Sequence, residues 1–596
     1  LVIPFVLFFG FWIKHETPLS DEFLSALWII KASLIIGIPL YLFTGQYKSL
    51  TRYVGSRSLY YLISRNALLV FLIIFFGKLM KLSLPSGGNL IIFLILVSFI
   101  SGGIRFILRD VLLYFADFKN KNLKKVAIYG AGSSGAQLEA SLRFSYDYNV
   151  ELFIDDDKEL WGRSLNDIPI RSINFLELNN QKIDQILIAI PSLKKSKYKK
   201  ILDKVAELNI SILRIPSLSE IANGKLKINS LRPILIEDIL GRDEIPPDPL
   251  LLSESIANKS ILISGAGGSI GAQLARKVLE INPSYLILFE INEPSLYQIH
   301  KELKNKYPKK HIYCILGSVS SEKLLETTIK KYNIDLIFHA AAYKHVPLVE
   351  ENPITGLENN IFSTLNICHV AENLGVKKVV LISSDKAVRP TNLMGVSKRI
   401  SELIFQAYSI KNTNKYQTCF SIVRFGNVLG SSGSVVPLFR EQIYKGGPIT
   451  ITDKAMVRYF MTIEEASNLV IQASALAKSG DILLLDMGEP IFIKSLAEKM
   501  INLAGLKVKN NSLDEGDIEI IYTGKRPGEK LYEELLISAK SEKTFHPLIY
   551  KAREKFIDSD ILLKELKNLK LYLKNFDHDS TFKLLKNLVP EWEQDF

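Results

Sequence analysis

The sequence predicts a multi-domain chain, with an N-terminal four-helix transmembrane region followed by two α/β Rossmann-like domains. Four apolar runs lie within the first 110 residues, and two later segments read as a strand, a glycine-rich turn and a helix. A chain of 596 residues is also too long for a single hydrophobic core. We place the membrane region at 1–115, the first α/β domain at 120–235, a linker at 236–255 and the second α/β domain at 256–596.

The composition narrows the class of protein. The net charge of +12 is compatible with nucleic acid, an anionic membrane surface or phosphorylated ligands as partners. Many basic residues flank the apolar runs, so we expect a membrane and not nucleic acid. The three cysteines, Cys314, Cys368 and Cys419, are far apart and show no CxxC spacing. This predicts a reducing compartment, without a disulfide framework or a metal site.

The four apolar runs differ in length, and a spanning helix needs about 20 residues. The second and fourth runs meet this requirement. The first looks truncated, and the third is long enough only if Tyr60–Arg65 contribute. The runs are Leu1–Ile13, Phe23–Phe43, Asn66–Met80 and Asn89–Leu108.

Charge between the runs predicts their orientation. The segment Thr44–Asn66 carries four basic residues and no acid, and further lysines and arginines follow Leu108. The positive-inside rule therefore places both segments, and the α/β domains, in the cytoplasm. The alternative is a buried helical bundle of a soluble protein. It is disfavoured because the runs lack the polar faces of soluble helices.

The first α/β unit opens with the strand Lys125–Tyr129, continues through Gly130-Ala-Gly-Ser-Ser-Gly135, and enters the helix Ala136–Phe144. The glycines have the GxGxxG spacing of nucleotide-binding turns. They can equally serve only the tight turn and close helix packing, so both interpretations stay open. We expect this domain to be non-catalytic.

The second unit has the strand Lys259–Ser264, a turn with GxxGxxG spacing and the helix Ala272–Glu280. Such glycines let the backbone approach a pyrophosphate at the helix N-terminus. Glu290 ends the next strand, where a carboxylate can bind ribose hydroxyls and repel a 2′-phosphate, which favours NAD over NADP. For Glu290 alone, a strand end facing water competes. The predicted cofactor contacts in the turn are Gly265, Gly268, Ser269, Ile270 and Gly271.

Four further segments carry a resemblance to a known family. They are FHAAAYKHVPL (338–348), SSDKAVRPTNLMGVSKR (383–399), VRFGNVLG (423–430) and RPGEKLYEE (526–534). Together they resemble the membrane-bound nucleoside-diphosphate-sugar 4,6-dehydratases of bacterial surface-glycan synthesis, in the extended short-chain dehydrogenase/reductase superfamily. The resemblance covers nearly the whole chain.

This resemblance implies the architecture and surroundings of the protein. The second α/β domain would be an extended short-chain dehydrogenase/reductase fold with a small C-terminal substrate-binding subdomain. The cofactor would be NAD and the substrate a UDP-sugar. The protein would be a homo-oligomer and a multi-pass protein of the bacterial inner membrane, with its catalytic domain in the cytoplasm.

The resemblance also implies catalytic roles. Short-chain dehydrogenases place a tyrosine four residues before a lysine; here Lys398 is present but Met394 occupies the tyrosine position and cannot relay a proton. Asp385 would protonate the departing C6 oxygen and Lys386 would remove the C5 proton. Ser384 would bind the C4 oxygen, and Lys398 the nicotinamide ribose.

Lys386 can act as a base only if burial and the charge of Lys398 lower its pKa well below the usual value of about 10.4. The competing interpretation of Asp385-Lys386 is a surface ion pair. It is disfavoured because the pair follows the strand Lys378–Ser383, at the sheet edge where sites collect in this fold. The group that deprotonates the C4 hydroxyl stays open between Asp385 and an ordered water.

Other roles follow from the same resemblance. Ala340 and Ala341 would pass near the cofactor. The sequence departs from the family at Ser318, where an aspartate usually contacts the adenine, and at Ser363, where glycine is common. The residues expected to bind the substrate are Lys344 and His345 at the sugar, Asn427, Arg458 and Arg526 at the diphosphate, and Glu529 at the nucleoside ribose.

We therefore expect a hydro-lyase that converts UDP-N-acetylglucosamine to UDP-2-acetamido-2,6-dideoxy-hexos-4-ulose for surface polysaccharide or protein glycosylation. One alternative is a nucleotide-sugar epimerase or reductase, which Met394 disfavours. Another is a non-catalytic membrane scaffold that senses nucleotide sugars, which the intact Asp385, Lys386 and Lys398 disfavour.

Overall fold

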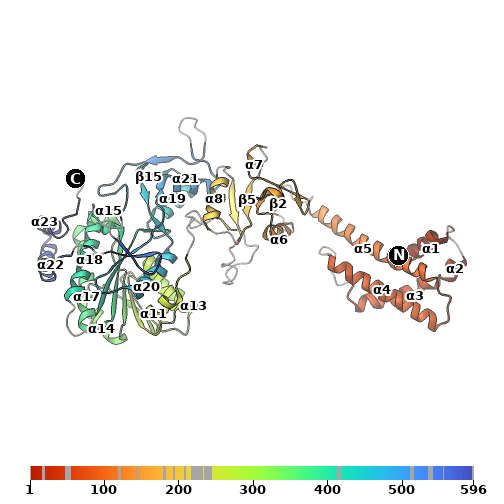
Figure 1. Ribbon diagram of the computed structural model, residues 1–596, viewed down its shortest axis with the longest axis horizontal. Coiled ribbons are helices and arrows are strands. Elements are labelled where there is room, and N and C mark those ends of the chain that lie inside the picture. The colour runs from red at the N-terminus through yellow and green to blue at the C-terminus, as the bar shows by residue number, and fades with distance from the viewer. Residues whose placement is uncertain are drawn as a thin grey trace. The chain divides into compact units, whose positions relative to one another are not determined.

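The computed structural model of the protein divides into two compact units, residues 1–124 with 142–149, and residues 125–141 with 150–596 (Figure 1). It describes residues 2–15, 21–46, 56–117, 123–143, 147–178, 183–191, 195–206, 208, 210–215, 232–233, 245–411, 418–509, 516–534, 541–552, 554 and 556–593.

The described part of the first unit between residues 2 and 117 is mostly helical. Its helices are α1 (Val2–His15), α2 (Asp21–Ser25), α3 (Trp28–Phe43), α4 (Ser56–Leu79) and α5 (Gly87–Asp117). Within these residues three stretches are long and apolar enough to cross a membrane: Phe23–Phe43, Leu59–Leu79 and Gly87–Leu108.

The prediction of four spanning helices is therefore wrong in its count. Helix α1 has 14 residues and rises only about 21 Å, whereas the hydrocarbon core of a bilayer is about 30 Å thick. The third run gains its length because α4 begins before Tyr60–Arg65 and includes them.

Polar side chains join the longer helices of this unit. The Tyr41 hydroxyl donates to Asn66 Oδ1 at 2.6 Å, and Asn66 Nδ2 donates to Ser98 Oγ at 3.0 Å. One chain of hydrogen bonds thus links α3, α4 and α5. Interhelical bonds of this kind are typical of membrane helices, which gain little from apolar contact alone.

The first α/β sheet has the strand order β3-β4-β2-β1-β5-β6-β7. In its glycine turn, a Cβ on Gly135 would lie 1.9 Å from Gly130 O, so helix α6 (Ser133–Leu142) can pack on the strand only without a side chain there. This contact explains one glycine by packing, and nucleotide binding stays a prediction. The strands are β1 (Lys124–Tyr129), β2 (Tyr148–Ile154), β3 (Ser164–Leu165), β4 (Ile168–Arg171), β5 (Gln185–Ile188), β6 (Ser211–Arg214) and β7 (Arg232–Pro233).

The second sheet has the order β10-β9-β8-β11-β12-β13-β18-β22-β21 and is parallel from β10 to β18. Two antiparallel strands close its other edge. The strands are β8 (Ser260–Ser264), β9 (Tyr285–Glu290), β10 (Ile312–Leu316), β11 (Leu336–His339), β12 (Lys378–Ser384), β13 (Cys419–Phe425), β18 (Ile482–Leu485), β21 (Ser541–Lys543) and β22 (Ile549–Ala552).

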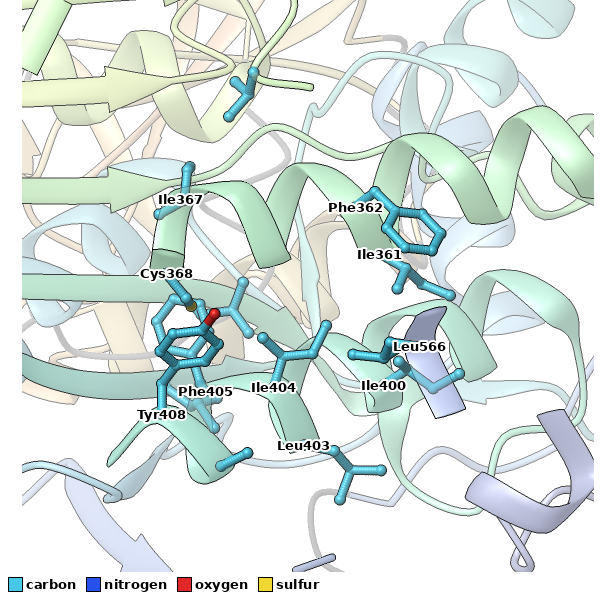
Figure 2. Close-up of a cluster of buried hydrophobic side chains, with 14 of the residues drawn as sticks. Ile361, Phe362, Ile367, Cys368, Ile400, Leu403, Ile404, Phe405, Tyr408 and Leu566 are labelled. Carbon is cyan, nitrogen blue, oxygen red and sulfur yellow. The ribbon is translucent and has the colours of Figure 1, made fainter. Parts of the chain in front are cut away.

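Helices cover both faces of this sheet, so successive strand residues are buried in opposite cores: Ile261 and Ile263 in one, Leu262 in the other. One face carries α11 (Pro249–Ile256), α12 (Ser269–Glu280), α13 (Glu293–Lys306) and α20 (Ile463–Leu476). The other carries α14 (Glu322–Tyr332), α17 (Ser363–Leu374), α18 (Leu393–Lys411), α22 (Ser559–Lys574) and α23 (His578–Leu588). Figure 2 shows side chains of α17, α18 and α22 gathered in this second core.

The predicted linker 236–255 is partly helical. Residues 234–244 lie outside the described residues, but α11 begins at Pro249 and is capped by Asp248, whose Oδ1 accepts from Leu250 N at 2.8 Å. Leu251 and Ile256 are buried, so this end of the segment is part of the core and not a connection.

A third, smaller hydrophobic core is formed by residues between Leu429 and Ile518. It is built from α19 (Val435–Tyr444), β15 (Ile449–Ile451), α21 (Ile493–Leu503) and β20 (Ile520–Tyr522). Strand β15 pairs in parallel with β20. Two further short pairs, β14 (Asn427–Val428) with β17 (Phe460–Met461) and β16 (Val457–Arg458) with β19 (Ile491–Phe492), connect the site residues to this core.

A network of buried charged side chains is bonded to β12 and β13. Arg424 of β13 is fully buried and pairs with Glu402 Oε2 at 2.7 Å and with Glu554 Oε1 at 2.8 Å. Arg399 Nη1 lies 3.1 Å from Glu554 Oε2, and Ser383 Oγ donates to Glu402 Oε1 at 2.6 Å. The network therefore ties the end of β12 to α18 and to residues after β22.

Replacing Arg424 with methionine should lower the free energy of unfolding by about 3–5 kcal/mol, because two buried carboxylates would then share the charge of Arg399 alone. The measurement is a denaturant titration of the detergent-solubilised protein, followed by tryptophan fluorescence, to which the buried Trp592 contributes.

The matched control is Arg276→Met. Arg276 also forms a two-point pair, with Glu302 at 2.6 and 2.7 Å, but both side chains are partly exposed. Its loss should cost about 0.2–1 kcal/mol. Equal losses for the two variants would contradict a special role for the buried network.

Candidate active site

The β8–α12 turn brings the backbone close to the end of β11. Gly265 has φ +69°, and a Cβ there would lie 2.7 Å from Ala341 N; on Gly271 a Cβ would lie 2.1 Å from Gly265 O. No side chain caps α12 at Gly268. The predicted cofactor contacts Gly265, Gly268, Ser269, Ile270, Gly271, Ala340 and Ala341 all line one cavity.

Glu290 ends β9 and lines the same cavity. Its Oε2 accepts from Gly267 N at 2.9 Å, and its Oε1 accepts from Ile291 N and Asn292 N, each at 2.9 Å. The carboxylate therefore fixes the turn, a role that the sequence reading did not foresee. A carboxylate has about four acceptor positions, so Glu290 can still accept a ribose hydroxyl.

The predicted catalytic pair follows β12 directly, in a single 3₁₀ turn, Asp385–Ala387. Lys386 Nζ donates to Asp385 Oδ1 at 2.9 Å and to Asn427 Oδ1 at 3.2 Å. The Ser384 hydroxyl also donates to Asp385 Oδ1, at 2.8 Å. Ser384 and Lys386 line the cavity, whereas Asp385 is 1% exposed and lies behind them, with Oδ2 buried and unbonded.

The pKa of Lys386 does not fall as the sequence reading required. Burial lowers it, but the negative charges of Asp385 and Glu533 together raise it above its usual value. Glu533 Oε1 lies 3.6 Å from Lys386 Nζ. The prediction that burial and the charge of Lys398 lower the pKa of Lys386 is therefore wrong, and Lys386 carries its proton at neutral pH.

Lys398 and Met394 lie on the first turns of α18 and both line the cavity. Lys398 Nζ donates to Ile382 O at 2.8 Å. Burial lowers the pKa of Lys398 to about 8, although Glu402 opposes this effect. Met394 is buried at 3% exposure and brings no proton donor to the position where the superfamily has a tyrosine.

All six predicted substrate residues, Lys344, His345, Asn427, Arg458, Arg526 and Glu529, line the cavity. Arg458, however, uses its N–H groups on backbone oxygens: Lys530 O at 2.8 Å, Leu531 O at 3.1 Å and Val457 O at 2.7 Å. Arg458 thus anchors the segment that carries Arg526, and its predicted phosphate contact would compete with these bonds.

Two other predicted substrate residues have distinct surroundings. Burial and the charge of Lys386 lower the pKa of Lys344. His345 contacts the backbone at Gly433, where an added Cβ would lie 2.3 Å from the imidazole, and burial lowers its pKa. The pKa of His345 favours the neutral imidazole, a form that can accept a hydrogen bond.

The sequence reading missed three residues that hold the site together. Glu350 Oε1 accepts from Leu393 N at 2.6 Å at the start of α18. Asn360 accepts from Tyr343 N at 2.7 Å and donates to Ser397 Oγ at 2.9 Å, which fixes the Lys344 segment against α18. The third is Glu533. It lies in the segment 526–534, which carried part of the resemblance, but no sequence pattern distinguished Glu533 from Glu534 as the residue near Lys386.

Comparison with known proteins places this site in a family. Residues 261–554 match the family described as "Polysaccharide biosynthesis protein", and residues 122–215 match "C2185-like, N-terminal". The capsular polysaccharide biosynthesis protein CapD of Staphylococcus aureus is 39% identical over 75% of this chain and 73% of its own length.

Shorter relatives have names for two different reactions. A UDP-N-acetylglucosamine 4,6-dehydratase (inverting) of Campylobacter jejuni is 33% identical over 48% of this chain and 80% of that protein. A UDP-glucose 4-epimerase of Rickettsia canadensis is 33% identical over the same shares. The match to CapD across about three quarters of both chains decides the family, and the chain belongs to the polysaccharide biosynthesis protein family.

Proposed function

We propose that the protein is an NAD-dependent 4,6-dehydratase of a nucleotide sugar, with UDP-N-acetylglucosamine as the substrate. The observation that carries the proposal is the Asp385–Lys386 pair, 2.9 Å apart at the end of β12, where Lys386 faces the cavity that also passes over the glycine turn. Enzymes of open parallel sheets bind their ligands at this edge. The dehydratase relative supports the sugar and the reaction.

The residues around the glycine turn fit NAD. The absence of side chains at Gly265 and Gly271 allows a close backbone approach, the uncapped start of α12 suits a pyrophosphate, and Glu290 suits a 2′-hydroxyl. When bound, NAD would accept a hydride from C4 of the sugar and return it to C6. Lys398, with its Nζ on Ile382 O, would hold the nicotinamide ribose.

The two catalytic roles require one proton to change its position within the pair. The resting pair is Lys386 ammonium and Asp385 carboxylate, whereas elimination needs a neutral amine at C5 and a carboxylic acid at C6. Transfer of a proton from Lys386 Nζ to Asp385 Oδ1, across 2.9 Å, supplies both forms without a change in net charge. Exclusion of water by the substrate favours the neutral form of such a pair.

The remaining residues orient the sugar. Ser384 lines the cavity and would bind the C4 oxygen while it donates to Asp385. Because Asp385 then already holds the proton from Lys386, the C4 hydroxyl proton would pass from the Ser384 position to an ordered water, a route that does not need a tyrosine. Asn427 touches Lys386 and would therefore approach the sugar side of the substrate, while Arg526 and Glu529 receive the nucleoside diphosphate.

A 4-epimerase is the second candidate, because an epimerase relative is as similar as the dehydratase relative. An epimerase must remove and return the proton of the C4 hydroxyl, which a tyrosine does in this superfamily. Here the buried Met394 occupies that position. The scaffold hypothesis gains no specific support from the arrangement of the site.

The membrane unit would anchor this catalyst. We propose that its three apolar stretches span the bacterial inner membrane, and that the basic residues after Leu108 keep the α/β domains in the cytoplasm. The homo-oligomer stays a prediction. A cytoplasmic catalyst on a membrane anchor would release its product close to membrane-bound glycosyl transfer.

Incubation of the detergent-solubilised full chain with NAD and UDP-N-acetylglucosamine should yield a nucleotide sugar that has lost one water. NMR should show a C6 methyl group and a C4 ketone or its hydrate. A 4-epimer without loss of water would identify an epimerase instead. The absence of any turnover with NAD bound, across a panel of UDP-sugars, would overturn both candidates.

Asp385→Asn should lower the rate of dehydration by about 10²–10⁴-fold, the usual contribution of a positioned acid or base. NAD content should stay at the wild-type level, because the Asp385 carboxylate bonds to Ser384 and Lys386 and not to the glycine turn. The measurement is the rate of product formation by NMR, with bound NAD quantified after denaturation. Wild-type turnover in this variant would remove Asp385 from the mechanism.

The pH profile of kcat/KM should have an alkaline limb near pH 8, because Lys398 with a lowered pKa of about 8 is charged below that pH and loses its charge above it. Lys398→Arg keeps the charge and should move the limb to higher pH at a lower rate, since arginine does not deprotonate in this range. An unchanged limb in the arginine variant would assign it to another group.

A further inference from the structure

The segment 526–534 is attached to the loop that follows the catalytic pair. Lys530 Nζ donates to Val388 O at 2.8 Å. Thr391 Oγ1 donates to Gly528 O at 2.6 Å, and Asn392 Nδ2 donates to the same oxygen at 3.0 Å. Together with the bonds from Arg458 to Lys530 and Leu531, these contacts fix the segment on both sides.

Glu533 is the one described carboxylate of this segment that faces the catalytic lysine. Its Oε1 lies 3.6 Å from Lys386 Nζ and 3.8 Å from Arg458 Nε. The side chain is 4% exposed, and its Oε2 is buried without a hydrogen-bond partner. The next residue, Glu534, is exposed and pairs with Arg389 at 3.3 Å.

We propose that Glu533 is a positioning residue for the reaction proposed above: its carboxylate holds Lys386 at the cavity wall from the segment that presents Arg526 and Glu529 to the substrate. The expected effect of Glu533 on catalysis rests on the proposed function. The contact itself is independent of the substrate. Through it, the segment that receives the nucleoside diphosphate also sets the position and charge of the group that acts on the sugar.

The charges around Lys386 give the direction of the effect. Asp385, on the same turn, and Glu533 are negative, whereas Arg458 and Lys344 are positive. Without Glu533, one carboxylate would face two cations in a buried site, so Lys386 should lose its proton at a lower pH. Its amine would also keep only two of its three polar neighbours, Asp385 and Asn427.

The first experiment measures Lys386 directly in the full chain in detergent. Competitive labelling with acetic anhydride across the alkaline range, with mass spectrometry of the peptide that contains Lys386, gives the pKa of this amine. Lys386 is accessible to the reagent because its side chain is 22% exposed. In Glu533→Gln the pKa should fall by about one unit or more. Glu533→Asp, which keeps the charge, should restore most of the difference.

The matched control is Glu534→Gln. It removes the adjacent carboxylate, which pairs with Arg389 and does not contact Lys386. Its labelling curve should coincide with that of the wild type. A general disturbance of the segment would shift Lys386 in both glutamine variants, whereas the proposed contact shifts it only in Glu533→Gln.

The second experiment measures dehydration of UDP-N-acetylglucosamine by the same variants. Glu533→Gln should lower kcat by about 10–100-fold, because the lysine is misplaced, with little change in KM since Arg526 and Glu529 are retained. Glu533→Asp should recover part of kcat. A rise in KM at unchanged kcat would show that Glu533 serves only to hold the substrate-binding segment.

The labelling and dehydration experiments distinguish a failure of the proposed function from a failure of the inference about Glu533. If the wild type does not dehydrate the sugar, the proposed function fails, and the labelling curves still decide whether Glu533 sets the charge of Lys386. If Lys386 titrates identically in the wild type and in Glu533→Gln, the inference is overturned even when the enzyme is a dehydratase.

Discussion

A half-buried ammonium group, that of Lys386 just after β12, is the constraint on which the site depends. Lys386 is surrounded by protein on most sides, and an unpaired charge there would cost several kcal/mol. Asp385 and Glu533 compensate it, and Asn427 accepts a further hydrogen bond. These partners come from the turn after β12, from the segment after β20 and from β14. The charge of one lysine therefore fixes how three parts of the chain converge on the cavity.

Bonds on both sides of β12 hold the turn that carries Lys386 in place. Directly behind the catalytic turn, Ser383 donates to Glu402, and Glu402 pairs with the buried Arg424. The residue before Ser383, Ile382, accepts from Lys398. Along β12, Ile382 and Ser384 thus line the cavity, and Ser383 between them bonds to the charge network of Glu402 and Arg424. A shift of β12 would break both sets of bonds, which explains how a short turn can hold its side chains in place.

Local patterns predicted the elements that depend on nearby residues. The apolar strands around Ile261 and Val379, the glycine turn at Gly265 and the position of Asp385 and Lys386 at a strand end all follow from sequence periodicity and spacing. The site residues outside those patterns did not follow. Glu533 approaches Lys386 only because Arg458, Thr391 and Lys530 fold its segment back, and these contacts join residues far apart in the sequence.

Length and charge were misjudged for the same physical reason. The prediction of four spans counted apolar runs, but within the described residues three stretches are long and apolar enough to cross a bilayer. Likewise, burial alone predicts a lowered pKa for Lys386, and only the three-dimensional positions of two carboxylates reverse its direction. Both quantities depend on what surrounds a residue in space.

The exchange of tyrosine for Met394 becomes intelligible in this setting. A tyrosine would bring a second proton donor to the C4 oxygen, beside Lys398, whose pKa burial has already lowered to about 8. In this chain Ser384 connects that position to Asp385, and Asp385 connects to Lys386. The proton that expels the C6 hydroxyl in the proposed reaction then passes from Lys386 through this one carboxylate. Met394 contributes an apolar side chain to the cavity wall. In the proposed reaction the acid and base are then Asp385 and Lys386, and Glu533 sets the charge of Lys386.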